Sequence, residues 1–334
     1  MTPLTFVTGS AVVGLEPRTQ HFRDAVLDAA GAPEVLGIPA APNLVVAEAA
    51  PDRAADRAAT VPVTRGITRE PDGTVVIASA GGSGYRQRWQ VGEDSVRVES
   101  QWSPSAKESL AARGLPSRFR ALRAQVLLHH PVLWWASLEG LAPLHVSVVE
   151  VGSTSVLLAG PGGVGKTSLV VGELAAGARA TCDNLAVSDG CDVFGLREPL
   201  RVPAQTAGRR TGPRAAHGRR EQRWRQVAPS LRPDVVVVVR RDGGTPGLRP
   251  VDRDSAHRAL VAGTMAAGEL MRFWPLAAVL GLATGTGPVL PPVDDVARTL
   301  VDRLPCHELR LGHQPGERLH DLLADLVGTA EVAR

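Results

Sequence analysis

The chain contains the segment Gly160-Pro161-Gly162-Gly163-Val164-Gly165-Lys166-Thr167, followed directly by Ser168. Residues 156–159 before it are apolar, as in a buried parallel strand, and residues 168–176 after it are typical of a helix. The spacing of Gly160, Lys166 and Thr167 matches the phosphate-binding P-loop. The glycines allow the backbone to turn tightly and to approach a ligand closely. The sequence therefore predicts that residues 160–168 bind nucleotide phosphates through backbone N–H groups at the start of the helix.

Lys166 stands out against the basic composition of the chain. Of the 37 lysines and arginines, only Lys107 and Lys166 are lysines. A compact ammonium fits a nest of backbone N–H groups better than a planar guanidinium, so a lysine here favours phosphate binding over a chance glycine-rich turn. In this interpretation Lys166 contacts the β- and γ-phosphates, and the Thr167 hydroxyl is a ligand of Mg²⁺. We expect ATP and Mg²⁺ to bind, although no base-reading motif separates ATP from GTP.

Length and composition limit the classes of protein to consider. With 334 residues, 44% of them hydrophobic, the chain is long enough for two domains with sizeable cores. The formal net charge of +3 is too small to predict nucleic-acid binding. Three cysteines without CxxC spacing argue against a disulfide framework and a structural zinc site. No segment has the pattern of a signal peptide or a membrane span, so we expect a cytoplasmic protein with no membrane partner.

Residues 1–130 are predicted to form a smaller α+β domain that helps to select the substrate. Four segments are typical of the strands of an antiparallel meander: residues 61–68, 74–78, 85–91 and 95–101. Three segments are typical of helices: residues 21–30, 105–115 and 117–130. Ser105 and Glu108 have the spacing of a capping box at the start of the second helix. The other residues among the first 60 give no clear pattern.

Residues 131–334 are predicted to form an α/β domain around the P-loop. The segments typical of strands are residues 146–151, 155–159, 180–182, 235–239 and 306–311. The segments typical of helices are residues 255–279, with breaks near Gly263 and Pro275, and residues 293–304 and 316–326. Five consecutive valines at 235–239 predict a strand that is buried on both faces.

Two polar residues next to these strands are candidates for the chemistry. Asp183 follows the strand after the P-loop helix, and His145 stands at the start of the strand before the P-loop strand. Ligands of open α/β sheets bind at the carboxyl ends of strands, so Asp183 is expected near the γ-phosphate. A carboxylate there accepts a proton from an attacking hydroxyl or binds Mg²⁺. The alternatives are a turn-capping role for Asp183 and a core or capping role for His145.

Three segments together resemble the catalytic core of HPr kinase/phosphorylase. They are residues 144–151 (Leu-His-Val-Ser-Val-Val-Glu-Val), the P-loop, and residues 174–184 (Leu-Ala-Ala-Gly-Ala-Arg-Ala-Thr-Cys-Asp-Asn). That family has a His at the head of a strand, an acidic residue five positions later, a P-loop, a helix ending in Leu-x-x-Gly, and a strand closing on Asp-Asp. The resemblance implies a P-loop kinase core like the C-terminal domain of that family. It also implies that Asp183 is the catalytic base, that His145 supports it, and that a homo-oligomer is plausible.

The chain also departs from this family pattern. Asn184 stands where the family has its second Asp, and an amide neither takes up a proton nor balances metal charge as a carboxylate does. The Gly-rich segment that follows in the family is absent, and residues 1–130 have no counterpart. The chain therefore resembles divergent kinase-like relatives, some of which belong to peptide natural-product pathways.

Residues 201–225 carry a concentration of positive charge. The arginines are Arg201, Arg209, Arg210, Arg214, Arg219, Arg220, Arg223 and Arg225, with Glu221 as the one acidic residue among them. Arginine binds phosphate and carboxylate groups in a bidentate manner, so the segment either closes over the triphosphate, docks an acidic substrate, or is a solvated loop in an arginine-rich chain. Glu198, just before it, is a candidate for a second metal-binding acid.

The sequence as a whole favours an ATP-dependent kinase that phosphorylates a hydroxyl. The expected acceptor is Ser or Thr of a peptide or a carrier protein, and a small-molecule hydroxyl is the nearer alternative. The more distant alternative is a nucleotide-binding regulator or scaffold with little turnover, which Asn184 keeps open.

Overall fold

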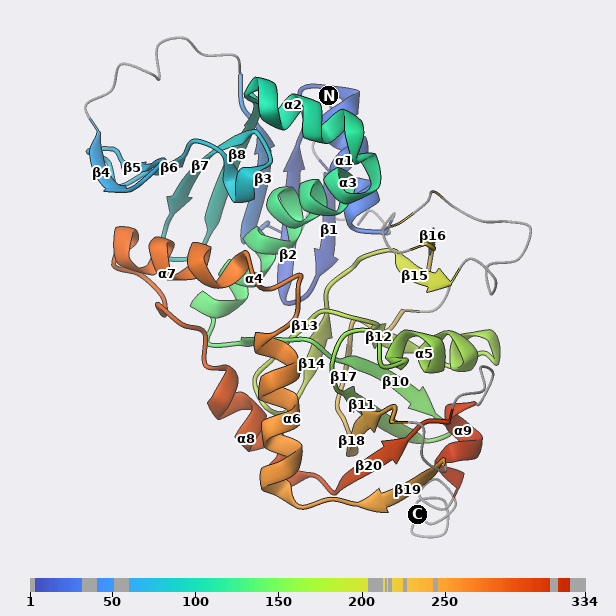
Figure 1. The fold of residues 1–334 in the computed structure, drawn as a ribbon. Coiled ribbons are helices and arrows are strands. Elements are labelled where there is room, and N and C mark those ends of the chain that lie inside the picture. Colours follow the sequence, from blue (N-terminus) through green and yellow to red (C-terminus); the bar gives the residue numbers. More distant parts are fainter. Residues whose placement is uncertain are drawn as a thin grey trace.

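The computed structural model describes residues 4–31, 41–50, 60–203, 213, 215, 218–224, 227–242, 246–312 and 318–324 (Figure 1). It is a mixed α/β structure whose strands form several sheets. None of the helices in these ranges has the length and apolarity that a membrane span requires.

The elements follow one another along the chain in this order. The strands are β1 (Leu4–Thr8), β2 (Ala11–Glu16), β3 (Leu44–Glu48), β4 (Val61–Thr64), β5 (Ile67–Arg69), β6 (Val75–Ile77), β7 (Tyr85–Val91), β8 (Val96–Trp102), β9 (Ala142–Leu144), β10 (Ser147–Val151), β11 (Thr154–Ala159), β12 (Ala180–Cys182), β13 (Ala186–Ser188), β14 (Val193–Gly195), β15 (Leu200–Pro203), β16 (Arg219–Gln222), β17 (Ser230–Leu231), β18 (Val235–Arg240), β19 (Gly247–Pro250) and β20 (Cys306–Arg310). The helices are α1 (Gln20–Ala29), α2 (Ala106–Gly114), α3 (Pro116–Ala124), α4 (His130–Leu138), α5 (Lys166–Ala175), α6 (Arg253–Met265), α7 (Phe273–Thr284), α8 (Val293–Arg303) and α9 (Leu319–Leu322).

The first sheet has the order β1-β2-β3-β8-β7-β6-β5-β4. The predicted meander is confirmed for β6, β7 and β8, which pair in antiparallel fashion. A single strand over residues 61–68 is wrong, because the chain turns back at Gly66, where φ is +74°, and forms the antiparallel pair β4–β5. Strands β1 to β3, which had no clear sequence pattern, complete this sheet through the parallel pairs β2–β3 and β3–β8.

Helices pack beside this sheet and join it to the rest of the molecule. The capping box at the start of α2 is confirmed, since Ser105 and Glu108 each bond the backbone of the other. The helix expected over residues 117–130 runs further, from α3 through a π turn at Gln125–His129 into the buried helix α4. Helix α7 packs on β4 and β6, so the core of the first sheet contains residues from both sides of residue 130. The domain division at residue 130 stays a prediction.

The second sheet has the order β12-β10-β11-β18-β20-β19. Strands β11, β18 and β20 are parallel to one another, whereas β10 is antiparallel to both β11 and β12. The five valines of β18 are buried, as predicted. Helices α5 and α9 cover one face and α6 and α8 the other, and each face has its own hydrophobic core (Figure 1).

The breaks predicted near Gly263 and Pro275 correspond to one interruption, at residues 266–272. Helix α6 ends two residues after Gly263, and α7 begins two residues before Pro275. Gly263 lies within α6. A Cβ at this position would lie 3.1 Å from the carbonyl oxygen of Gly160, so the missing side chain lets α6 pass close to the loop. Pro275 falls in the first turn of α7, where its missing N–H leaves no helical hydrogen bond unmade.

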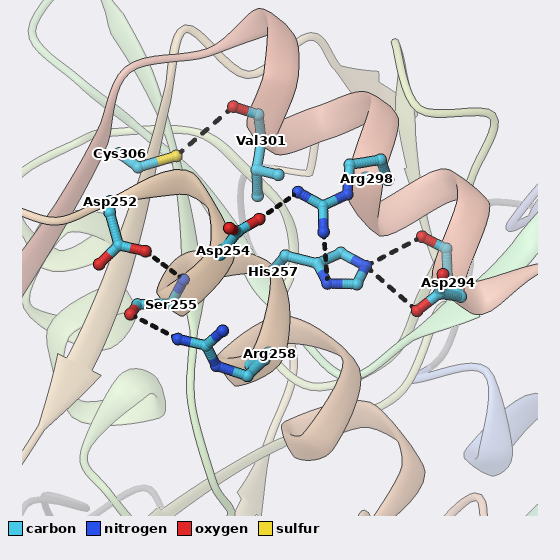
Figure 2. Close-up of polar contacts among 9 residues, drawn as sticks. All are labelled: Asp252, Asp254, Ser255, His257, Arg258, Asp294, Arg298, Val301 and Cys306. Carbon is cyan, nitrogen blue, oxygen red and sulfur yellow. Dashed lines mark hydrogen bonds and ion pairs between the residues drawn. The ribbon is translucent and has the colours of Figure 1, made fainter.

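A histidine joins α6 to α8 on the outer layer (Figure 2). The Nδ1 atom of His257 faces Nη2 of Arg298 at 3.3 Å, which makes Nδ1 the acceptor. The other nitrogen, Nε2, therefore carries the proton and donates to the backbone oxygen of Asp294 at 3.2 Å. Arg298 also pairs with Asp254 at 2.8 Å, so α6 and α8 are tied at two points. This link fixes the helix that carries Gly263.

Candidate functional site

The strand directions bring the predicted site residues to one edge of the second sheet. Because β11 and β12 are both antiparallel to β10, their carboxyl ends lie at the edge where β10 begins. Gly160 follows β11, Asp183 follows β12, and His145 precedes β10. The carboxyl ends of β18 and β20 lie at the same edge. Residues that are far apart in the sequence therefore meet around the glycine-rich loop.

The loop at residues 160–167 is open to an incoming group. Pro161, Gly162 and Gly163 are exposed, and a Cβ at Gly162 or Gly163 would have no atom within 4 Å. Gly160, at φ +141°, has no such space, because a Cβ there would lie 2.7 Å from the carbonyl oxygen of Val239. The side chain of Val164 is buried and anchors the loop.

Helix α5 begins directly after this loop. It starts at Lys166 with no side-chain cap, so its first N–H groups are available to an anion. Ser168 is exposed at this end.

The ammonium of Lys166 lies across the loop. Its Nζ donates to the carbonyl oxygens of Gly160 at 2.7 Å and Pro161 at 3.2 Å. Burial lowers the pKa of Lys166 to about 8, and the charges of Asp183 and Glu269 oppose that change. The side chain is therefore largely charged at neutral pH.

Asp183 is a buried carboxyl with a free oxygen. Its side chain is 5% exposed, and its Oδ1 has no hydrogen-bond partner among the described residues. Burial raises the pKa of Asp183 to about 6, against a hydrogen bond with the Thr167 side chain and the charges of Arg201, Lys166 and Arg219. Buried polar atoms usually have a partner, so this oxygen is left available to accept a hydrogen bond or to bind a cation.

His145 forms hydrogen bonds with Asn184 and with α6. Among the described residues, it forms no hydrogen bond with Asp183. Nδ1 lies 3.1 Å from the carbonyl oxygen of Gly263, and Nε2 lies 3.1 Å from Oδ1 of Asn184. Burial, with the nearby charge of Lys166, lowers the pKa of His145 to about 4, so the ring is neutral and has one N–H. Both ring nitrogens face acceptor oxygens, and a neutral ring has one N–H, so it donates to one of the two, the Gly263 carbonyl or Oδ1 of Asn184.

Next to these residues lies a cluster of ion pairs, in which Arg201 is bound by both Glu198 and Glu269. Arg201 contacts Glu198 at 3.2 Å and Glu269 at 3.1 Å. Burial raises the pKa of Glu198 to about 7, and the charge of Arg201 opposes that rise. Asp183 and the Asn184 side chain also affect this carboxyl, so Glu198 belongs to the same cluster. Sequence reasoning missed Glu269, which follows α6 with no motif around it.

The residues present fit a magnesium ion bound with a nucleotide. Thr167 and Asp183 offer the oxygen ligands that Mg²⁺ prefers, and one of the Asp183 oxygens is unpartnered within the described ranges. No group of three or more His, Cys, Asp or Glu residues in the described part of the chain has the arrangement of a metal site. Mg²⁺ commonly takes one or two protein ligands and completes its shell with phosphates and water, so this donor set is sufficient.

The arginine-rich segment is described only in part. Arg201 and Arg219 lie on the antiparallel pair β15–β16, where Arg201 stands opposite Glu221. Glu221 also pairs with Arg120 of α3 at 3.2 Å. Four of the arginines lie outside the described residues: Arg209, Arg210, Arg214 and Arg225.

Comparisons with known proteins give a distant structural likeness. No protein-family model matches the chain, and no curated protein matches it. Among solved structures, the chain is similar to the Hpr(Ser) kinase/phosphatase from Coxiella burnetii, at 11% sequence identity and a TM-score of 0.28. The match covers 57% of this chain and 97% of that chain.

Proposed function

We propose that the chain is an ATP-dependent phosphotransferase, with a P-loop kinase core in residues 131–334, that transfers the γ-phosphoryl group to a hydroxyl. The observation that best supports this is the buried carboxyl of Asp183, whose Oδ1 has no partner within the described residues. It lies at the sheet edge where the loop of residues 160–168 also lies. A kinase needs this pair of features: a cradle for phosphates and an acceptor for the hydroxyl proton.

In the proposed reaction the acceptor hydroxyl gives its proton to Asp183 while its oxygen attacks the γ-phosphorus. The bond from the γ-phosphorus to the bridging oxygen breaks, and ADP leaves with the electron pair. With its pKa raised to about 6 by burial, Asp183 is a stronger base than an exposed carboxylate and is still mostly ionised at neutral pH. Lys166 would exchange its loop carbonyls for phosphate oxygens. When bound by Thr167 and Asp183, Mg²⁺ would neutralise phosphate charge.

The proposed acceptor is Ser or Thr of a peptide or carrier protein, with a small-molecule hydroxyl as the nearer alternative. Residues 1–130 would take part in selecting it. This role is supported by the ion pair between Arg120 of α3 and Glu221 of β16, because it brings the first half of the chain beside the hairpin that carries Arg201.

Asn184 favours a second candidate function, a nucleotide-binding regulator with little turnover. An amide beside the catalytic acid holds less negative charge than a carboxylate, so it would bind a metal–phosphate complex less strongly. In that case the site would bind ATP and set the conformation of the chain without transferring phosphate.

The test is phosphate transfer from γ-labelled ATP to an array of Ser- and Thr-containing peptides by the full chain. We expect label on a subset of peptides. Asp183→Asn should lose about 10²–10⁴-fold in transfer rate, as expected for a general base, with a much smaller loss of Mg·ATP affinity because the amide is a weaker metal ligand. Lys166→Ala should lose nucleotide affinity itself.

Each other result has a clear meaning. Binding of ATP with neither transfer nor hydrolysis would support the regulator. Unchanged transfer by Asp183→Asn would remove Asp183 from its role, and no nucleotide binding by the wild type would refute both functions.

A further inference from the structure

The second sheet places different strands on the two sides of the loop at residues 160–167. The loop follows β11, and the sheet order puts β12 on one side of it and β18 and β20 on the other. In the proposed function the acceptor hydroxyl lies near Asp183, on the side of β12. The attacking and leaving oxygens of phosphoryl transfer stand roughly in line, on opposite sides of the phosphorus. ADP, with its base, is therefore expected over the carboxyl ends of β18 and β20.

Arg241 follows β18 on this side and lies against the loop. Its Nε donates to the carbonyl oxygen of Val164 at 3.2 Å, and its Nη1 donates to the carbonyl oxygen of Gly312 at 3.1 Å. A Cβ at Gly165 would lie 3.2 Å from Nη2 of Arg241 and 3.0 Å from the side chain of Leu311. The guanidinium therefore contacts the loop directly, at the residue before α5 begins.

These contacts fix the orientation of the guanidinium. Its N–H groups lie in the plane of the group, so the two carbonyl oxygens hold that plane by its edge. The faces of the plane form no hydrogen bonds, and Arg241 is exposed. A planar cation whose face is open to solvent is a surface on which an aromatic ring can stack.

The other arginines at these two strand ends are bound to carboxylates. Arg240 pairs with Glu308 at 2.8 Å, and Arg310 pairs with Asp242 at 3.4 Å. The two residues that follow β20 are a leucine and a glycine, which have no planar side chain. Among the residues that the structure describes at these ends, Arg241 alone presents a guanidinium that the loop holds and no carboxylate neutralises.

We infer that Arg241 binds the base of the nucleotide, which stacks on the exposed face of its guanidinium. This inference rests on the proposed function and assigns a residue to the base, for which the sequence holds no motif. The contact is the same before and after phosphoryl transfer, so Arg241 supports nucleotide binding and not the chemical step. A guanidinium face contacts the ring of the base and not its edge, so Arg241 adds affinity without choosing between adenine and guanine.

The experiment measures, by calorimetry on the full chain, the affinity for Mg·ATP and for Mg²⁺ with ribose 5-triphosphate, which lacks only the base. Arg241→Ala should bind Mg·ATP about five- to thirtyfold more weakly than wild type, the range expected for one cation–π contact. Its affinity for the ribose triphosphate should stay within about twofold of wild type. Arg232→Ala, an exposed arginine just before the same strand, is the control and should match wild type with both ligands.

Two further measurements separate stacking from charge and from support of the loop. Arg241→Lys keeps the positive charge without the planar face, so it should lose most of the same affinity for Mg·ATP. In steady-state transfer to a peptide that the wild type phosphorylates, Arg241→Ala should raise the KM for ATP by a similar factor. Its kcat should stay within about twofold, because the lost contact stabilises the ground state and the transition state equally.

Other results would overturn the inference. Equal losses of affinity for Mg·ATP and for the ribose triphosphate, or a fall in kcat, would show that Arg241 supports the loop or binds phosphate. Wild-type affinity for Mg·ATP in Arg241→Ala or Arg241→Lys would refute the stacked base. In each of these cases a wild type that transfers phosphate leaves the proposed function standing. A wild type that binds no Mg·ATP refutes the proposed function, and the role of Arg241 with it.

Discussion

Replacing Glu198 by Gln should change how the stability of the chain depends on pH. Glu198 is 2% exposed, and burial raises its pKa from 4.5 to about 7. Because the folded-state pKa is higher than the unfolded-state value, the stabilisation from the protonated acid is complete below about pH 4.5 and is lost as the pH rises to about 7. At about 1.4 kcal/mol for each pH unit, the loss amounts to roughly 3 kcal/mol.

Glutamine has nearly the shape of protonated glutamic acid and does not titrate. The free energy of unfolding of Glu198→Gln should therefore be close to that of wild type at pH 4.5. Relative to wild type, it should rise by roughly 3 kcal/mol by pH 8. Taking the difference between the two proteins at each pH cancels the titration of the other buried groups.

The measurement is urea unfolding, followed by tryptophan fluorescence, at half-unit steps from pH 4.5 to pH 8. Glu93→Gln, in an exposed turn, controls for the chemical change itself. A stability difference that stays constant over this range would show that Glu198 keeps its charge in the folded chain. The reasoning from its burial would then be refuted.

Four further substitutions test how the helices pack. Gly263→Ala would put a Cβ 3.1 Å from the Gly160 carbonyl oxygen and should weaken ATP binding, measured by calorimetry. The control is Gly172→Ala in α5, which has open space around it. This control should keep its ATP affinity and stabilise the chain by about 0.5–1 kcal/mol, seen as a higher melting temperature. His257→Ala removes hydrogen bonds that join α6 to α8 and should cost about 1–3 kcal/mol in urea unfolding; an unchanged midpoint would contradict the link drawn in Figure 2. Glu173→Ala removes the carboxylate that accepts hydrogen bonds from the segment around α9, so hydrogen exchange in α9 should become faster while exchange in β18 stays slow.

The sequence predicted correctly those features that are determined by residues close to one another along the chain. The capping box of Ser105 and Glu108 is contained within four positions, and both of its hydrogen bonds form. The buried strand at 235–239 needs only its own apolar side chains to be identified. The position of Asp183 after β12 followed from the order of strand, loop and helix, which is again local.

Other parts of the fold depend on residues that are distant in sequence. Strand β3 pairs with β8, so Leu44 lies opposite Val96, and no pattern within residues 41–50 indicates that partner. In the sequence, a glycine at position 263 suggests a helix break. In the structure Gly263 lies within α6, where the missing side chain leaves room for the Gly160 carbonyl of a different element. Glu269 joins the cluster through its ion pair with Arg201 and through its charge near Lys166. Tertiary contacts of this kind leave no periodic signal in the sequence.

Asn184 is an example of a motif residue whose surroundings in the fold cannot be judged from the motif alone. Read along the chain, Asn184 removes a carboxylate next to Asp183 and argues for a weakened site. In the folded chain the Asn184 side chain lies close enough to Glu198 to affect its pKa, and Glu198 is buried in the same cluster. A second carboxyl group is therefore buried near Asn184, although it comes from a residue fourteen positions further along the chain. Counting acids along the motif alone misses this group, because only the fold brings Glu198 to the cluster.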